Sequence, residues 1–254
     1  MLSKDLDSDI LNRKQEAFVS EKDIEMMGSK RSVNMAELRL ENVRYRYGKK
    51  SRWILTGCNA VCQEGTVTSI RGRSGSGKST LLHLIAGFDT ATEGKVIWNG
   101  KKLERKGLTE YRRKEAGIIS QSFLLFPTRT VLENVCYPLE LKKEKKEEAQ
   151  KKAIECLEAV GLSQELYHRL PGRLSGGEQQ RVAIARCMAG EYPLIVADEP
   201  TGSLDEENAQ AVMNLLKRVA SERNTIVVMV THDSEMAEQA DVKLRLVNGQ
   251  LQQV

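Results

Sequence analysis

The chain lacks the long hydrophobic runs that mark a membrane-spanning protein or a secreted precursor. None of its apolar stretches approaches the ~18 residues that a membrane-spanning helix needs, and TIVVMV at 225–230 has only the length of a strand. The first residues, MLSKDLDSDILNRKQEAF, contain no apolar core of signal-peptide length. We therefore expect a soluble protein that reaches a membrane, if at all, only through a partner.

Paired cysteines and a strong excess of one charge are also missing. The five cysteines stand apart and form no C-x-x-C pair, which favours reduced thiols over a disulfide framework. The closest two, Cys58 and Cys62, supply too few ligands for a zinc site. With 39 basic and 35 acidic side chains, the net charge of +4 is too small to indicate nucleic acid as a partner.

The composition and pattern of the sequence change near residue 36. Residues 1–36 are highly charged, and we expect either a solvated, partly disordered extension or a docking helix over 9–27. From 37 to 254, short β-like runs alternate with helical ones, and the later strands are continuously apolar. This alternation predicts an α/β fold around a largely parallel sheet, interrupted by a mostly helical insert at about 122–188.

Within the helical insert, one long charged run shows a helical pattern. The run from 139 to 162 is rich in lysine and glutamate, and its apolar residues recur at helical spacing from Leu141 to Val160. We interpret its charges as a solvated face.

The segment GRSGSGKST, 72–80, concentrates three glycines in six residues. It satisfies the pattern G-x4-G-K-[ST], in which glycines let successive backbone N–H groups point at phosphate oxygens and a following helix offers its positive N-terminal end. Lys78 would reach the β- and γ-phosphates, and the Ser79 hydroxyl would hold Mg²⁺. The predicted phosphate-binding residues are Arg73, Ser74, Gly75, Ser76, Gly77, Lys78, Ser79 and Thr80.

A second candidate site is LIVADE, 194–199, where four apolar residues precede two acids. A buried parallel strand places such carboxylates at its C-terminal end, where α/β sheets bind their ligands. Asp198 would then hold Mg²⁺, through water, and Glu199 would accept a proton from the attacking water. The pattern alone is common at strand ends, and the phosphate loop upstream gives it its functional meaning.

The segment LSGGEQQR, 174–181, is the most discriminating motif, because with the two preceding motifs it closely resembles the signature of ATP-binding-cassette (ABC) ATPases. The resemblance covers roughly residues 37 to 254 and assigns the remaining site residues. It implies that Tyr47 stacks on adenine, Gln121 contacts Mg²⁺ and the attacking water, and His232 acts in catalysis. The residues that it implies for closing the ATP site from a partner chain are Ser175, Gly176, Gly177 and Asp205.

Membership of this family implies a P-loop NTPase fold with a RecA-like core, an antiparallel β subdomain and a helical subdomain. It also implies a homodimer packed head to tail around two ATP molecules, with ATP and Mg²⁺ bound between the chains. A separate integral-membrane permease would anchor the dimer to the cytoplasmic face of the membrane. Within the family, the residues in and around these motifs look most like those of the macrolide-export, lipoprotein-releasing and cell-division branch (MacB, LolD, FtsE).

Several functions fit this resemblance. The chain is expected to drive an exporter or a mechanotransmission complex acting on peptides, lipids or other amphiphiles. The alternatives are a signalling ATPase that moves no solute and a soluble ABC ATPase acting on nucleic acid or ribosomes.

Three local features leave further questions. Arg73 and Ser120 depart from the residues usual in the family, a proline and an aromatic, without removing a catalytic group. The apolar loop 123–126 either receives the membrane subunit or seats the helical subdomain.

Overall fold

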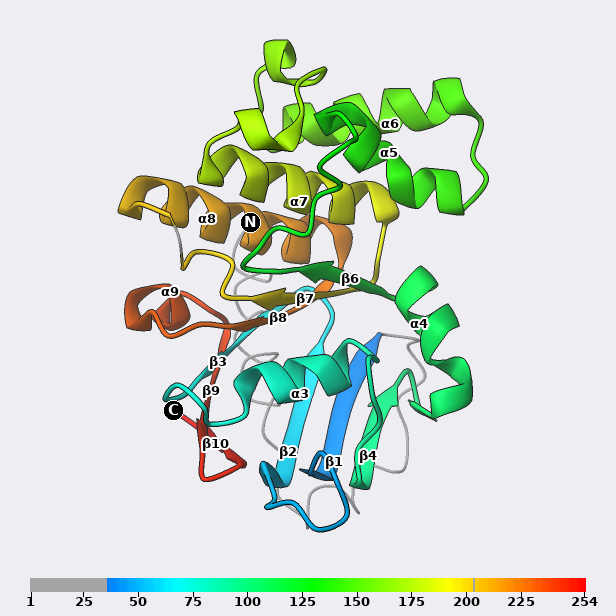
Figure 1. Ribbon diagram of the computed structural model, residues 1–254. Coiled ribbons are helices and arrows are strands. Elements are labelled where there is room, and N and C mark those ends of the chain that lie inside the picture. The colour runs from blue at the N-terminus through cyan, green and yellow to red at the C-terminus, as the bar shows by residue number, and fades with distance from the viewer. Residues whose placement is uncertain (1–35, 203) are drawn as a thin grey trace, which may run out of the picture.

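The computed structural model describes residues 36–202 and 204–254, and two sheets organise the fold (Figure 1). The expected extension or docking helix at the N-terminus lies outside these described residues. The larger sheet has the strand order β10-β9-β3-β8-β7-β6, and every neighbouring pair is parallel except β10 with β9. The strands are β3 (Val67–Arg71), β6 (Ala116–Ile119), β7 (Leu194–Asp198), β8 (Ile226–Val230), β9 (Val242–Val247) and β10 (Gln250–Gln253).

The parallel strands read as continuous apolar runs because both faces of this sheet are covered. All five residues of β8 are buried, as are the first four residues of both β3 and β7. Such strands can carry charged side chains only where they end. The charged residues of β3 and β7, Arg71 and Asp198, therefore lie where these strands end, at one edge of the sheet, whereas the uncharged Thr68 and Ser69 are buried within β3.

The smaller sheet is antiparallel, with the order β2-β1-β4-β5. Its strands are β1 (Glu37–Tyr45), β2 (Leu55–Gln63), β4 (Glu93–Trp98) and β5 (Lys101–Lys102). Buried and more accessible residues alternate along β1 and β2, as expected for strands with one solvated face. Strands β4 and β5 pair as a hairpin over the segment 93–102.

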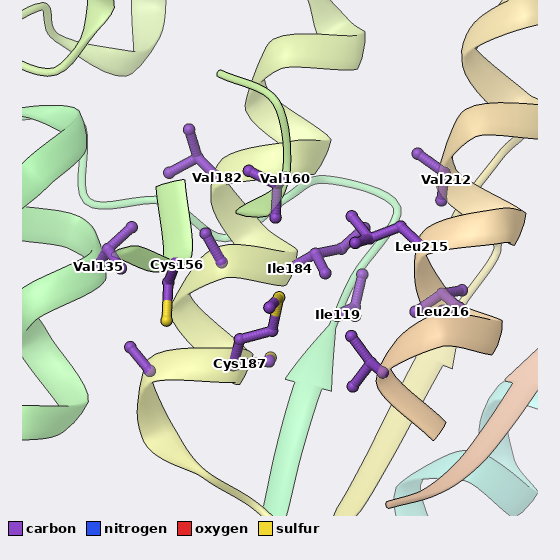
Figure 2. Close-up of a cluster of buried hydrophobic side chains, with 14 of the residues drawn as sticks. Ile119, Val135, Cys156, Val160, Val182, Ile184, Cys187, Val212, Leu215 and Leu216 are labelled. Atoms are coloured by element: carbon purple, nitrogen blue, oxygen red, sulfur yellow. The ribbon is translucent and has the colours of Figure 1, made fainter. Parts of the chain in front are cut away.

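Helix α3 (Lys78–Ile85) lies between the two sheets, and a helical layer covers the opposite face of the parallel sheet (Figure 1). This layer consists of α5 (Val131–Leu141), α6 (Lys146–Ala159), α7 (Gly176–Gly190) and α8 (Glu206–Arg223). The shorter helices are α4 (Leu108–Lys114), α9 (Ser234–Glu238) and the 3-10 turns Arg105–Gly107, Gln164–Leu166 and Pro171–Arg173. Figure 2 shows Val135, Ile184 and Leu216, which come from three of these helices and belong to one buried cluster with Ile119 of β6.

The charged run from 139 to 162 is not a single helix. Helix α5 ends at Leu141, whose side chain is exposed, and α6 begins only at Lys146. Between them Lys143 takes a left-handed φ of 61°, which breaks the helical path. The sequence pattern correctly placed Ala149 and Leu157 on the buried face of α6, but it extended the helical spacing across this turn.

Within the described residues, none of the helices combines the length and the apolar character needed to cross a bilayer. All five cysteines are buried and carry free thiols. Burial raises the pKa of Cys58 to about 12 and that of Cys187 to about 11.

Replacing Gly94 by alanine tests the junction between β4 and β1. Gly94 has a φ of +77°, and a Cβ there would lie 2.1 Å from the carbonyl oxygen of Asn42. We expect Gly94→Ala to lower the free energy of unfolding by about 3 kcal/mol, combining backbone strain with overpacking. Gly100→Ala is the matched control, because Gly100 has a similar φ of +74° and open space around it, and it should cost only about 1 kcal/mol. Equal losses in urea-unfolding experiments would contradict this account.

Candidate active site

The phosphate loop connects the end of β3 to the start of α3. Gly75 and Gly77 have φ values of 72° and 102°, so both take a conformation that other residues rarely adopt. A Cβ on Gly77 would also lie 2.9 Å from the Ile54 methyl group, which leaves room for glycine alone. Ser76 Oγ is buried and makes no hydrogen bond with another described residue. The loop thus presents backbone N–H groups and the N-terminal end of α3 to one concave space, the arrangement that suits a phosphate.

Lys78 is the first residue of α3, and its side chain is only 8% exposed. Its Nζ donates to the carbonyl oxygens of Gly72 at 2.8 Å and Arg73 at 3.1 Å. These neutral acceptors stabilise the ammonium without cancelling its charge, because no described carboxylate forms an ion pair with it. The full positive charge therefore remains available to an anion in the loop.

A cavity of about 690 Å³ opens in front of the phosphate loop. Tyr47 stands at its rim with 69% of its surface exposed, and its hydroxyl lies 3.2 Å from Thr80 Oγ1. An exposed aromatic ring above a phosphate cradle matches the shape of a nucleotide, which has a flat base at one end and charged oxygens at the other. The lining residues are Tyr47, Ser51, Arg52, Ile54, Ser74, Gly75, Gly77, Lys78, Ser79, Thr80, Glu199 and His232.

The carboxylate of Glu199, which directly follows β7, lines this cavity. Glu199 has a φ of 48°, and its N–H donates to the Val230 carbonyl at 2.9 Å, which ties the turn after β7 to the end of β8. Its Oε2 lies 3.2 Å from His232 Nδ1. The carboxylate and the imidazole, which come from the ends of neighbouring strands, are therefore within hydrogen-bond distance of each other at the cavity wall.

Asp198 lies close enough to Ser79 for the Ser79 hydroxyl to stabilise the charged form of its carboxyl. Burial raises the pKa of Asp198, and the neighbouring charge of Glu199 raises it further, while Ser79 and Lys78 act in the opposite direction. The Ser79 hydroxyl and the Asp198 carboxylate are hard oxygen ligands, and Mg²⁺ commonly takes one or two such protein ligands together with waters and substrate phosphates. The described residues include no group of three or more His, Cys, Asp or Glu that could hold a metal by itself. The donor set therefore fits Mg²⁺ bound together with a phosphate.

The remaining candidates do not line this cavity. Gln121 follows β6 at the same edge of the sheet and is exposed. Ser175 and Asp205 cap helices instead: Ser175 accepts the N–H of Glu178 at the start of α7, and Asp205 accepts that of Asn208 at the start of α8. The chain thus assembles one part of the expected ATP site and leaves Ser175, Gly176, Gly177 and Asp205 outside it.

Sequence reasoning missed three residues of the cavity wall, Ser51, Arg52 and Ile54. They lie in the connection between β1 and β2, four to seven residues after Tyr47, and have no motif of their own. Their place in the wall follows only from the turn that brings Ile54 against Gly77.

Comparison with known proteins gives consistent results. Residues 55–202 match a protein-family model described as "ABC transporter". The lipoprotein-releasing system ATP-binding protein LolD of Psychrobacter arcticus is 47% identical over 209 residues, which is 81% of this chain and 92% of that protein. An uncharacterized ABC transporter ATP-binding protein, YbbA of Escherichia coli, is 44% identical over 81% of this chain and 91% of its own length. The ATP-binding cassette MJ0796, solved as a post-hydrolysis dimer with ADP and Pi, is 39% identical with a TM-score of 0.77, over 85% of this chain and 98% of that one.

Removing the negative charge of Asp198 should stabilise the folded protein at neutral pH. Because the folded-state pKa is raised above its unfolded value, folding stability falls as pH rises from about 4 through the raised pKa. We expect Asp198→Asn to melt at a higher temperature than the parent at pH 7.5, with the difference vanishing near pH 3.

Asp205→Asn is the control of opposite sign for this experiment. The N–H of Asn208 lowers the pKa of Asp205, so its charge contributes stability at neutral pH that is lost as pH falls. The variant should melt at a lower temperature at pH 7.5. An Asp198→Asn variant that melts below the parent at every pH would contradict the raised pKa assigned to Asp198.

Proposed function

The chain belongs to the ABC transporter family as an ATP-binding ATPase, and we propose that two copies of it drive a separate membrane permease by closing around ATP. ATP hydrolysis is the activity of this family member, and its curated relatives include a lipoprotein-releasing system subunit. The observation that carries the proposal is the half-site described above. One chain supplies an aromatic rim, a phosphate cradle, a carboxylate and a histidine, while its signature residues lie outside the cavity.

In the proposed reaction, the base of ATP stacks on Tyr47 and the phosphates enter the loop 73–80. Lys78 Nζ lies on the carbonyls of Gly72 and Arg73, and it turns toward the β- and γ-phosphates when these bind. Charge developing on the γ-phosphate oxygens is stabilised by this ammonium and by the N-terminus of α3. Ser79 and Asp198 would hold Mg²⁺, with Gln121 at the same edge of the sheet, and the bound cation would neutralise phosphate charge.

Glu199 is the proposed base that accepts a proton from the attacking water. Its contact with His232 fixes the direction of the carboxylate, since Oε2 is engaged and the other oxygen is left for water. His232 therefore acts as a positioning residue for Glu199 and lies close enough to the cavity to contact the γ-phosphate.

The second half of the site comes from the partner copy in this proposal. The capping box of Ser175 and Glu178 orients the first turn of α7, and its early N–H groups lack partners within the helix. Ser175, Gly176 and Gly177 of one copy would cover the γ-phosphate in the other, with Asp205 beside them. The dimers reported for the cassette MJ0796 support this arrangement.

The loop 123–126 is the proposed receiver of the permease. Leu124 is 58% exposed, so it does not serve to pack the helical subdomain, whereas Leu125 packs against the helical core. Arg186 of α7 donates to the carbonyls of Leu124 at 2.8 Å and Phe123 at 3.2 Å. The loop therefore offers an apolar side chain to a partner while being anchored to the helix that carries the signature.

The proposed place of action is the cytoplasmic face of the membrane, and the proposed cargo class is peptides, lipids or other amphiphiles. The name of the LolD relative supports a lipoprotein- or lipid-handling partner. A signalling complex that moves no solute would use the same ATP-driven closure.

Glu199→Gln should separate ATP binding from hydrolysis. Glutamine retains the size of the side chain but cannot accept a proton from water, so ATP is held and not cleaved. We expect ATP turnover to fall at least about 100-fold while ATP still binds, and a dimer to accumulate in sedimentation experiments with ATP and Mg²⁺. Turnover close to that of the parent would overturn the assignment of Glu199.

Purification of the tagged chain from its native membranes in mild detergent tests the proposed partner. A polytopic protein that co-purifies with wild-type protein, and less with Leu124→Asp, is the expected result. A variant that replaces the equally exposed Phe88 by aspartate serves as the control. Recovery of ribosomal or nucleic-acid-associated proteins alone would contradict the permease and favour a soluble ABC ATPase.

A further inference from the structure

A second cavity lies on the other flank of the phosphate loop and is lined by three arginines. It measures about 720 Å³ and is bounded by the connection before β2, the loop 73–76 and the hairpin of β9 and β10. Arg52, Arg73 and Arg245 reach its wall from these three segments. Arg52, Ile54, Ser74 and Gly75 line both this cavity and the nucleotide cavity, so the two share one wall.

These three guanidinium groups lack acidic partners within the described part of the chain. Other arginines on the same sheet are paired; Arg71, for example, lies 2.9 Å from Glu238. Trp53, also in the wall, has the guanidinium groups of Arg44 and Arg46 at 4.2 Å and 4.4 Å from its ring, but Arg44 is paired with Glu93, so the unpaired charge of the wall comes from Arg52, Arg73 and Arg245. The cavity is therefore a concentrated positive surface that calls for an anion.

An acidic turn begins α8 and is complementary to this cavity. Asp205, Glu206 and Glu207 are consecutive and all exposed. None of them forms an ion pair with another described residue, although Asp205 accepts hydrogen bonds from Asn208. In Figure 1 the start of α8 and the β9–β10 hairpin lie on the same side of the molecule, α8 above and the hairpin below.

The acidic turn is fixed to the signature within each chain. Asn208 Oδ1 accepts a hydrogen bond from Arg181 of α7 at 2.8 Å. The same oxygen lies so close to Gly177 that a Cβ on Gly177 would be only 2.9 Å from it. A Cβ on Gly176 would lie 3.8 Å from the Leu204 side chain. A copy that brings its signature over a phosphate loop must therefore bring its acidic turn to the flank of that loop.

We propose that the acidic turn of each copy, Asp205–Glu207, forms ion pairs with the arginine cavity of the other copy when the dimer closes. The inference rests on the head-to-tail dimer of the proposed function and names a charge interaction that holds it. Under two-fold symmetry the contact occurs twice, so a single substitution alters both contacts of the dimer. Arg73, which stands where proline is frequent in the family, would then add a pairing group particular to this chain.

Mixing two charge-reversed proteins tests the proposal directly. Both carry Glu199→Gln to trap ATP, and one adds Arg245→Glu while the other adds Glu206→Lys and Glu207→Lys. Each alone sets like charges against one another at both contacts, and we expect its dimer dissociation constant with ATP and Mg²⁺ to rise at least about tenfold. In the mixture, one contact is native and the other is reversed on both sides, so heterodimers should form with near-parental affinity.

Two controls keep the outcome specific. Glu147→Lys with Glu148→Lys reverses an equally exposed acidic pair in the first turn of another helix, α6, and should leave the dimer unchanged. ATP binding and melting temperature of each monomer show that Arg245→Glu has not damaged the phosphate loop or the fold. Milder changes, Arg245→Gln and Glu206→Gln with Glu207→Gln, replace any variant that melts early, and each should weaken the dimer to a smaller extent.

The outcomes separate this inference from the proposed function. A Glu199→Gln parent that stays monomeric with ATP contradicts the head-to-tail dimer and, with it, the ion pairs. A parent that dimerises while both reversed variants dimerise equally well contradicts the ion pairs alone. Weakened variants that fail to recover on mixing also overturn the proposal, because the charges would then act within one chain or on a free anion.

Discussion

The burial of parallel strands on both faces is the constraint on which the rest of this structure depends. Strands β7 and β8 carry apolar side chains along their length, β3 adds only the uncharged Thr68 and Ser69, and all three can accommodate charge only at their ends. Their C-terminal ends meet at one edge of the sheet, and there the chain places the phosphate loop, Asp198 with Glu199, and His232. The active site is thus assembled by the same pattern that makes the core.

The carboxylates show what this placement costs. Asp198 is held where burial and its neighbour Glu199 disfavour its charge, and Ser79, His83 and Lys78 offset only part of that effect. Lys78 is kept charged by two backbone carbonyls and not by an acid. Negative and positive groups are therefore held close but unpaired, which leaves both to act on a bound phosphate and its cation.

Much of this arrangement could be predicted from the sequence, because its motifs stand at the ends of recognisable strands. The phosphate loop, the two acids after β7 and the alternation of strands and helices all follow from local pattern. What could not be predicted depends on contacts between distant segments. The turn at Lys143 divides a continuous helical pattern, and Arg52 and Arg245 come together beside the phosphate loop only because β2, β3 and the β9–β10 hairpin are neighbours in space.

The loop after Gln121 has a consequence for how motion can pass through the molecule. Phe123 and Leu124 have φ values of 59° and 50°, and a residue cannot move from there to a negative φ without crossing a sterically forbidden region near zero. Since one guanidinium holds both carbonyls, the two residues would have to change together. While both residues keep this conformation, Arg186 therefore ties the position of Leu124 to that of α7.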